Sequence, residues 1–407
     1  MKTELGRKIR ELREKFCYSQ DDLAIYLKTS RATVAQMELG NRVIDSITLD
    51  KIADFLGCDP LVFFEKEQSL SDPAAILFRA NSDLNMHIEL KECIAECRKL
   101  GRERINLREI LKIETDPLTR PSYTLKPPSS KWEAKNQGQR IAEQERRRLE
   151  LGHQPVTDII KLIESQGILV GQEKMPNDIS GFTITDKDAG LFIFINSEHP
   201  GVRKRFSLVH EYCHAIVDTN RTFSITYTSK HAELLEVRAN AFAAHFLVPT
   251  DICRDKVHEI GKGFPSRDEA SVFNENEPLE IHKRNIRSEQ SIQLYEVGAM
   301  ALWFGVSILT MLYRLKNTGF LSNSELDTLL KEEKGPYGTP LRSIMKKEET
   351  DTIFKSTNLF RMNIFNMALE ALRRNEISTG KCIEIAKLAG INTEEAFSVI
   401  QDYNSDE

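Results

Sequence analysis

The sequence predicts a multidomain, mainly α-helical protein that contains one small α+β unit. Amphipathic helical patterns fill residues 1–65 and 289–402. Between them, three short runs rich in β-branched and aromatic residues lie within residues 168–196, and such runs favour strands. The 407 residues, 40% hydrophobic and 29% charged, have the balance of a soluble globular protein and suffice for two to four domains.

Charge and cysteine content exclude several classes of protein. The formal net charge of −5 is unlike that of a basic nucleic-acid coat, so DNA binding would need a local patch. The seven cysteines are an odd number without framework spacing, which argues against a secreted disulfide scaffold. No apolar run approaches the roughly 20 residues that span a bilayer, and the charged N-terminus lacks the apolar core of a signal peptide. We therefore expect a cytoplasmic protein without a membrane partner.

Composition changes along the chain predict four segments: a compact all-α domain at 1–66, a charged helical and Pro-rich linker at 67–131, an α+β unit at 132–290 and an all-α region at 291–407. The linker holds four prolines from Pro117 to Pro128, and this density of proline disfavours a helix. We expect an extended arm there.

The α+β unit is predicted from a regular succession of patterns. Its expected elements are a helix at 156–166 ended by Gly167, strands at 168–173, 181–186 and 191–196, a helix from Pro200 to about Asp218, and a helix from about His231 to Leu247. This succession predicts a small three-stranded sheet, with a tight hairpin at 187–190. If the strand at 191–196 is a sheet edge, an extended polypeptide can pair with it.

The first helix after the strands carries the pattern H-E-x-x-H at 210–214. Residues i and i+4 share a helix face, so His210 and His214 can reach one tetrahedral Zn²⁺. Glu211 stands beside the first histidine, where it can act as a general base without binding the metal. Apolar residues flank the pattern, and two buried histidines beside a glutamate need a reason that surface histidines do not.

A third metal ligand has to come from another element. Glu236 heads a stripe of small and apolar residues on the following helix, which predicts an inward-pointing carboxylate. Glu233, His231 and Asp218 are the alternatives. The first two lie nearer the helix start, where an acidic residue also answers the helix dipole. Glu236 is therefore the favoured third ligand.

This region resembles the ImmA/IrrE-type (M78-like) metallopeptidases. The similarity lies in R-x-x-F-x-x-x-H-E-x-x-H at 203–214 and E-x-x-A-N-x-F-A-x-x-x-L-x-P at 236–249; it is close over 150–250 and looser over 291–320. One departure is Tyr212-Cys213, where the family usually has Leu and a small residue. The resemblance implies a zincin-like core and zinc-dependent cleavage of a protein, commonly a helix-turn-helix repressor of mobile-element, phage-defence, stress or DNA-damage genes.

A second pattern fills residues 6–60. Ser19 and Ser30 are expected to cap helices at 20–27 and 31–38, and Thr48 a helix at 49–55. Together with S-x-x-T-V-x-x-x-E-x-G at 30–40, this run resembles a Cro/repressor-type (xenobiotic-response-element) helix-turn-helix domain. The resemblance implies binding to double-stranded DNA.

In such domains the second helix of the motif enters the major groove. The resemblance places these residues at base edges: Arg31, Ala32, Thr33 and Gln36. It places these at phosphates: Gln20, Ser30, Asn41 and Arg42. Residues 1–65 are about neutral overall, so a protein-interaction or dimerisation module on the same fold, with a second copy of the chain as partner, is the alternative.

Two functions remain open on the sequence. The first is a DNA-binding regulatory zinc metalloprotease that cleaves a helix-turn-helix repressor or its own linker. The second is a transcriptional repressor or antitoxin whose peptidase fold senses a metal or ligand without proteolysis. Replacing Glu211 by Gln should abolish cleavage under the first hypothesis and leave DNA regulation untouched under the second.

Overall fold

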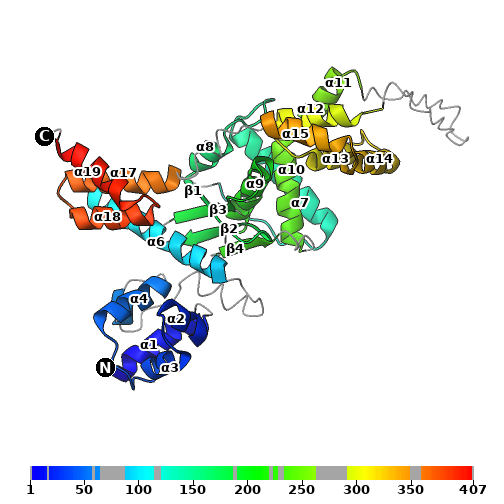
Figure 1. Cartoon of the computed structure of the whole chain (residues 1–407). Helices are drawn as coiled ribbons and strands as arrows, with labels where there is room; N and C mark the ends of the chain where they lie inside the picture. The colour runs from blue at the N-terminus through cyan, green and yellow to red at the C-terminus, as the bar shows by residue number, and fades with distance from the viewer. Residues whose placement is uncertain are drawn as a thin grey trace, which may run out of the picture.

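The structure is a computed structural model that describes residues 2–15, 18–56, 60–64, 88–113, 121–186, 190–219, 223–227, 233–262, 291–348 and 359–405. Helices dominate it, and one small mixed sheet lies near the middle of the molecule (Figure 1). The predicted fold class, multidomain and mainly α-helical, is confirmed. The predicted hairpin at 187–190 falls largely outside the described residues.

The N-terminal domain is a group of short helices: α1 (Lys2–Lys15), α2 (Gln20–Tyr26), α3 (Arg31–Glu38), α4 (Ser46–Leu56) and the 3-10 helix η1 (Pro60–Phe63). Ser19 and Ser30 cap α2 and α3 as predicted, because their side chains accept hydrogen bonds from backbone amides in the first turn. The predicted cap Thr48 is wrong. Its backbone N–H donates to Asp45 Oδ1 at 2.7 Å, so α4 begins before the predicted residue 49.

The α+β unit holds a four-stranded sheet: β1 (Ile168–Glu173), β2 (Ile179–Asp186), β3 (Gly190–Asn196) and β4 (Phe223–Tyr227), in the order β1-β3-β2-β4. β1 and β3 are parallel, whereas β2 is antiparallel to β3 and β4. The prediction of three strands missed the short β4. The condition under which an extended polypeptide could pair with β3, a place at the sheet edge, is not met, because β1 and β2 flank it on both sides.

The helices next to the sheet (Figure 1) are α6 (Ile88–Leu111), α8 (Ile159–Glu164), α9 (Gly201–Val217) and α17 (Leu359–Arg373). Beyond α9 follow α10 (Leu234–Leu247) and α7 (Lys131–Arg148), and α11 (Thr250–Glu259) lies away from the sheet. β3 joins two cores because its side chains alternate between the two faces of the sheet. Phe192 and Phe194 belong to a core shared with α6 and α17, and both rings meet Phe360 edge-on, at 5.9 and 6.0 Å between centroids. Ile193 and Ile195 belong to the core of α9 and α10.

The predicted all-α region at 291–407 forms two helix groups at opposite sides of the sheet (Figure 1). The first contains α12 (Leu294–Phe304), α13 (Ile308–Asn317), α14 (Asn323–Lys334) and α15 (Gly338–Glu348); the second contains α17, α18 (Thr379–Leu388) and α19 (Thr393–Ser405). The first group shares the core of α9 and α10, and the second packs on α6, which lies inside the predicted linker. The domain boundaries themselves stay predictions.

No single described helix is long and apolar enough to cross a membrane. Only α12 and α13 taken together meet that length and composition, and they are bent by 102° relative to each other.

Three helices lie side by side where the H-E-x-x-H pattern is found. α10 packs against both α9 and α7. Gly138 permits the close approach of α7, because a Cβ there would overlap the carbonyl oxygen of Arg238 and the amide nitrogen of Phe242. Side chains of α7 can therefore reach those of α10.

Candidate metal centre

The H-E-x-x-H helix is α9, and it is buried on all sides in its second half. The side chains from Ser207 to Val217 are all buried between the sheet, α8 and α10. His210 is 2% exposed and His214 3% exposed. The interpretation as two surface histidines is therefore excluded.

Three donor groups converge at one point. Glu236 Oε2 lies 3.1 Å from His210 Nε2, and Glu236 Oε1 lies 3.3 Å from His214 Nε2. The two Nε2 atoms are 3.1 Å apart. A tetrahedral ion with bonds of about 2.0–2.1 Å would hold its ligands about 3.3 Å from one another. The observed spacing fits such an ion.

The outer ring nitrogens are held by hydrogen bonds that fix the tautomers. His210 Nδ1 donates to Asn240 Oδ1 at 2.9 Å, and His214 Nδ1 donates to Asp218 Oδ2 at 2.8 Å. A neutral imidazole that donates from Nδ1 presents a lone pair at Nε2. Two such lone pairs and a carboxylate repel one another unless a cation lies between them, and this arrangement is typical of metal-bound histidines.

The pKa values of His214 and Glu236 also indicate that this cluster favours a positive charge. Burial lowers the pKa of His214, but hydrogen bonds to Asp218 and Glu236 outweigh it and raise the pKa to about 10. Burial raises the pKa of Glu236, but the two histidines outweigh it and hold that pKa well below its usual range. The cluster thus attracts positive charge, which a divalent ion would supply.

The alternative third ligands take other positions. Asp218 lies behind His214, on the Nδ1 side. Glu233 is exposed at the start of α10, and His231 lies outside the described residues. Within the part of the chain that the structure describes, Glu236 completes the one group of acids and histidines whose donor atoms all lie within 4.8 Å of one another.

Glu211 is buried beside this group and held at one oxygen. Thr183 Oγ1 donates to Glu211 Oε2 at 2.6 Å, whereas Oε1 is buried with no hydrogen-bond partner among the described residues. Gly181 on the same strand lets β2 lie close to β3, because a Cβ there would overlap the carbonyl oxygen of Phe194 at 2.6 Å. Sequence reasoning missed Thr183. The signal was present: a polar residue between Phe182 and Ile184 that faces α9 by strand alternation.

The comparisons agree with this geometry. Residues 163–263 match the peptidase M78 family, described as the IrrE N-terminal-like domain, and residues 9–63 match a helix-turn-helix family. The chain joins a helix-turn-helix domain to an M78-type peptidase domain. All three donors and Glu211 lie inside the peptidase match. No curated protein matches the chain significantly.

The departure Tyr212-Cys213 is accommodated inside the peptidase domain. The Tyr212 hydroxyl donates to Glu145 of α7, which also accepts from Tyr123 at 2.6 Å and from Arg148 at 2.6 Å. The tyrosine therefore ties α9 to α7 without leaving a polar atom unsatisfied. Cys213 is fully buried, and burial raises the pKa of its thiol well above the usual value, which is the environment of an unreactive thiol.

In the helix-turn-helix domain, most of the residues predicted to contact bases are exposed. Arg31, Ala32 and Gln36 on α3 are exposed, and Thr33 is half-buried. A ligand outside the chain can reach this face.

The residues expected at phosphates differ in exposure and in the hydrogen bonds that they already make within the domain. Asn41 and Arg42 are exposed. Ser30 Oγ accepts from the backbone N–H of Thr33 at 3.2 Å as the α3 cap. Gln20 Nε2 donates to Glu38 Oε2 at 2.8 Å, so one side-chain donor of Gln20 is occupied within the domain. DNA contact by these residues stays a prediction.

Proposed function

We propose that the protein is a DNA-binding regulatory zinc metallopeptidase. The observation that carries this proposal is the convergence of three buried donor groups next to a carboxylate, one oxygen of which has no hydrogen-bond partner among the described residues. His210, His214 and Glu236 would hold the Zn²⁺ through two imidazole nitrogens and a carboxylate. When bound, the metal supplies a Lewis acid that acidifies a water and polarises the scissile carbonyl.

Glu211 performs the proton transfers. Its Oε1 is available to accept a proton from the attacking water and to return it to the leaving amine. Thr183 holds Oε2 at 2.6 Å, so the carboxylate keeps one orientation and offers one oxygen. The buried surroundings strengthen these interactions, because the local dielectric is low.

The substrate proposed is a regulatory protein, either a helix-turn-helix repressor or a copy of this chain. The fused helix-turn-helix domain supports this, because it would bring the peptidase to DNA where a repressor is bound. Cleavage in the linker has a structural constraint within residues 121–131. There the Tyr123 N–H donates to Ile216 O at 2.9 Å, so this segment would have to detach from α9 first.

The test compares zinc-loaded wild-type protein with Glu211→Gln. The amide variant keeps an oxygen for the Thr183 hydrogen bond but cannot accept the water proton. Each protein is incubated with the helix-turn-helix repressors encoded beside its gene and alone, and fragments are identified by mass spectrometry. We expect defined fragments from the wild type and none from Glu211→Gln, at equal zinc content.

Two outcomes contradict the proposal. Equal cleavage by Glu211→Gln would remove the general base from the mechanism. Absence of cleavage by both proteins, together with zinc-dependent DNA binding by both, would favour the alternative of a metal-sensing repressor or antitoxin.

A further inference from the structure

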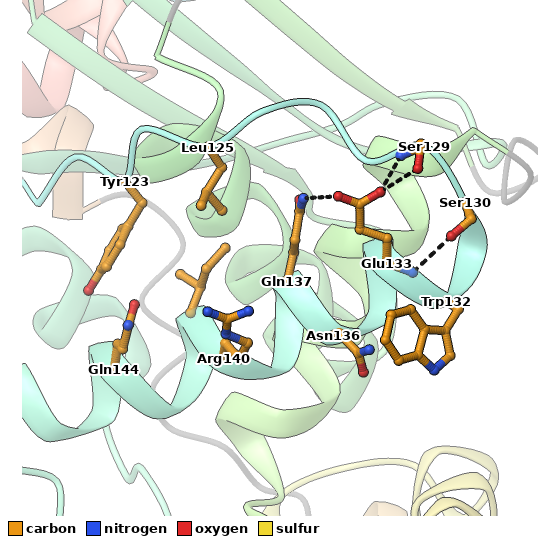
Figure 2. A pocket seen from close by; sticks show the side chains of 11 residues that line it. Tyr123, Leu125, Ser129, Ser130, Trp132, Glu133, Asn136, Gln137, Arg140 and Gln144 are labelled. Carbon is orange, nitrogen blue, oxygen red and sulfur yellow. Dashed lines mark hydrogen bonds between the residues drawn. The ribbon is translucent and has the colours of Figure 1, made fainter.

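The extended segment 121–130, called the arm below, lies along α7 (Figure 2). At one end, the Tyr123 N–H donates to Ile216 O on α9. At the other, Ser129 N and Oγ donate to Glu133 Oε2 at 2.7 and 2.6 Å. Between these points Gln137 Nε2 donates to the backbone carbonyl of Lys126 at 3.2 Å. The arm is therefore fastened to both the H-E-x-x-H helix and α7.

A groove of about 510 Å³ runs between the arm and α7. Tyr123 and Leu125 line it from the arm, and Gln137, Arg140 and Gln144 line it from α7 (Figure 2). Gln137 is thus both a wall of this groove and a fastening of the arm.

Gln137 also begins a chain of hydrogen bonds to the metal centre. Arg238 Nη1 donates to Gln137 Oε1 at 3.4 Å. Arg238 Nη2 donates to Asp218 Oδ1 at 2.5 Å, and Asp218 Oδ2 accepts from His214 Nδ1 at 2.8 Å. The series runs from the arm carbonyl to the imidazole without a gap.

Arg238 is the central member, and its surroundings explain how the series would act. Its side chain is 1% exposed, and its Nε has no hydrogen-bond partner among the described residues. The guanidinium is therefore placed by Asp218 at one end and Gln137 at the other. Its charge sets how strongly Asp218 attracts the His214 Nδ1 proton, and thereby how strong a donor Nε2 is.

We propose that Gln137 and Arg238 are positioning residues of the metal centre, and that through them the arm controls metal affinity. This inference rests on the proposed zinc site. Without the contact between Lys126 and Gln137, the Nε2 of Gln137 is held by Glu133 alone, at 3.3 Å. The support of Arg238 is then looser, and zinc is held less tightly.

The test measures zinc affinity of the full-length chain by competition with a chromogenic chelator. Loss of an outer-shell partner typically costs about 10- to 100-fold in metal affinity, so we expect that loss for Arg238→Gln. Gln137→Ala, one step further out, should lose about 3- to 10-fold by the same principle. Because the two act in series, the double variant should bind zinc no more weakly than Arg238→Gln alone.

The matched control is Gln144→Ala. Gln144 lines the same groove from the same helix, and none of the hydrogen bonds of the described residues includes it. It should bind zinc like the wild type. A second measurement follows exchange of the Tyr123 amide: zinc should slow it more in the wild type than in Gln137→Ala, because coupling between two sites is reciprocal.

Wild-type zinc affinity in Gln137→Ala, or losses that simply add in the double variant, would overturn the coupling. A wild-type chain that binds no zinc would instead overturn the proposed function. If Arg238→Gln does not fold, the comparison of Gln137→Ala with Gln144→Ala decides alone.

Discussion

The two candidate sites of this chain, the metal centre and the helix-turn-helix domain, differ in how far their residues are exposed to solvent. In the metal centre, His210 and His214 are 2% and 3% exposed, and the Nδ1 atom of each is held by another side chain. In the helix-turn-helix domain, the Arg31 side chain is 68% exposed. A small ion supplies no structure of its own, so the protein must build its site in advance. DNA brings its own rigid surface, so exposed side chains suffice.

This difference predicts how substitutions behave. Around the metal centre, a change should be felt by neighbours through shared hydrogen bonds. On α3 and the following turn, a change should leave the peptidase domain untouched, and the coupling there is limited to exposed contacts such as the one from Arg42 Nη1 to Thr33 Oγ1 at 3.3 Å.

After the loss of cleavage expected for Glu211→Gln, the largest effect expected is that of Thr183→Val on cleavage. The change removes the hydroxyl that holds Glu211 Oε2 and leaves the shape of the side chain nearly unchanged. General-base catalysis is worth about 10²- to 10⁴-fold, and we expect a loss of about 10- to 100-fold within that range. The measurement is the cleavage rate with zinc affinity determined in parallel. Zinc affinity should stay constant, and Thr183→Ser should restore the rate. Full activity in Thr183→Val would show that Thr183 does not position the base.

A smaller effect is expected for Arg42→Ala on DNA binding. Arg42 is exposed in the turn after α3 and is predicted to meet a phosphate. Its loss should weaken binding to a random-sequence duplex and lower the slope of log K against log salt by about 0.9, measured by fluorescence anisotropy. Arg373→Ala, an exposed arginine in the far helix group, should leave that slope unchanged. An unchanged slope for Arg42→Ala would favour the protein-interaction module.

The smallest effect expected is a pH dependence confined to the peptidase side. Burial, with the nearby Arg314, lowers the pKa of His245 to about 3, whereas the unfolded chain has about 6.5. Below about pH 6.5 the unfolded chain therefore binds a proton that the folded chain does not. The stabilisation linked to His245 is fully present above that pH. Below it the free energy of unfolding falls as the pH drops towards 3, by at most about 1.4 kcal/mol per pH unit.

Thermal unfolding of the metal-free protein between pH 6.5 and 5 measures this effect, because in that range His214, whose pKa the fold raises to about 10, is largely protonated in both states and adds little slope. His245→Gln keeps an oxygen that can accept from Arg314 and should flatten the dependence of the peptidase-side transition. A wild-type transition that is already flat would mean that the histidine protonates without loss of structure.

Local patterns predicted most of the elements, because each depends on neighbouring residues. β1 was predicted with its observed bounds, and so was α3. α8 begins later than the predicted residue 156 because Asp158 caps it, through the backbone N–H of Lys161 at 3.0 Å. What local patterns lack is pairing between distant segments. The internal place of β3 and the addition of β4 depend on such pairing. The sequence left the place of β3 open, and β4 was missed.

In the candidate site too, the residues set by local sequence were predicted, and the residues contributed by distant segments were not. The spacing of His210, Glu211 and His214 is a local property of one helix, and Glu236 was inferred from a stripe on the next. Thr183, which holds Glu211, and Gln137, which contacts Arg238, were not inferred, because they come from a strand and a helix that meet the site only in the folded chain. Asp218 was weighed as a ligand, and its contact with His214 Nδ1 instead gives it the place of an outer partner.

The burial of β3 on both faces has a consequence for shortened forms of the protein. A chain that ended after α15 would retain every proposed metal ligand. It would also uncover Phe192 and Phe194, which α17 covers through Phe360. An exposed aromatic strip on a sheet invites self-association, so truncation by a cellular protease would yield an aggregating fragment.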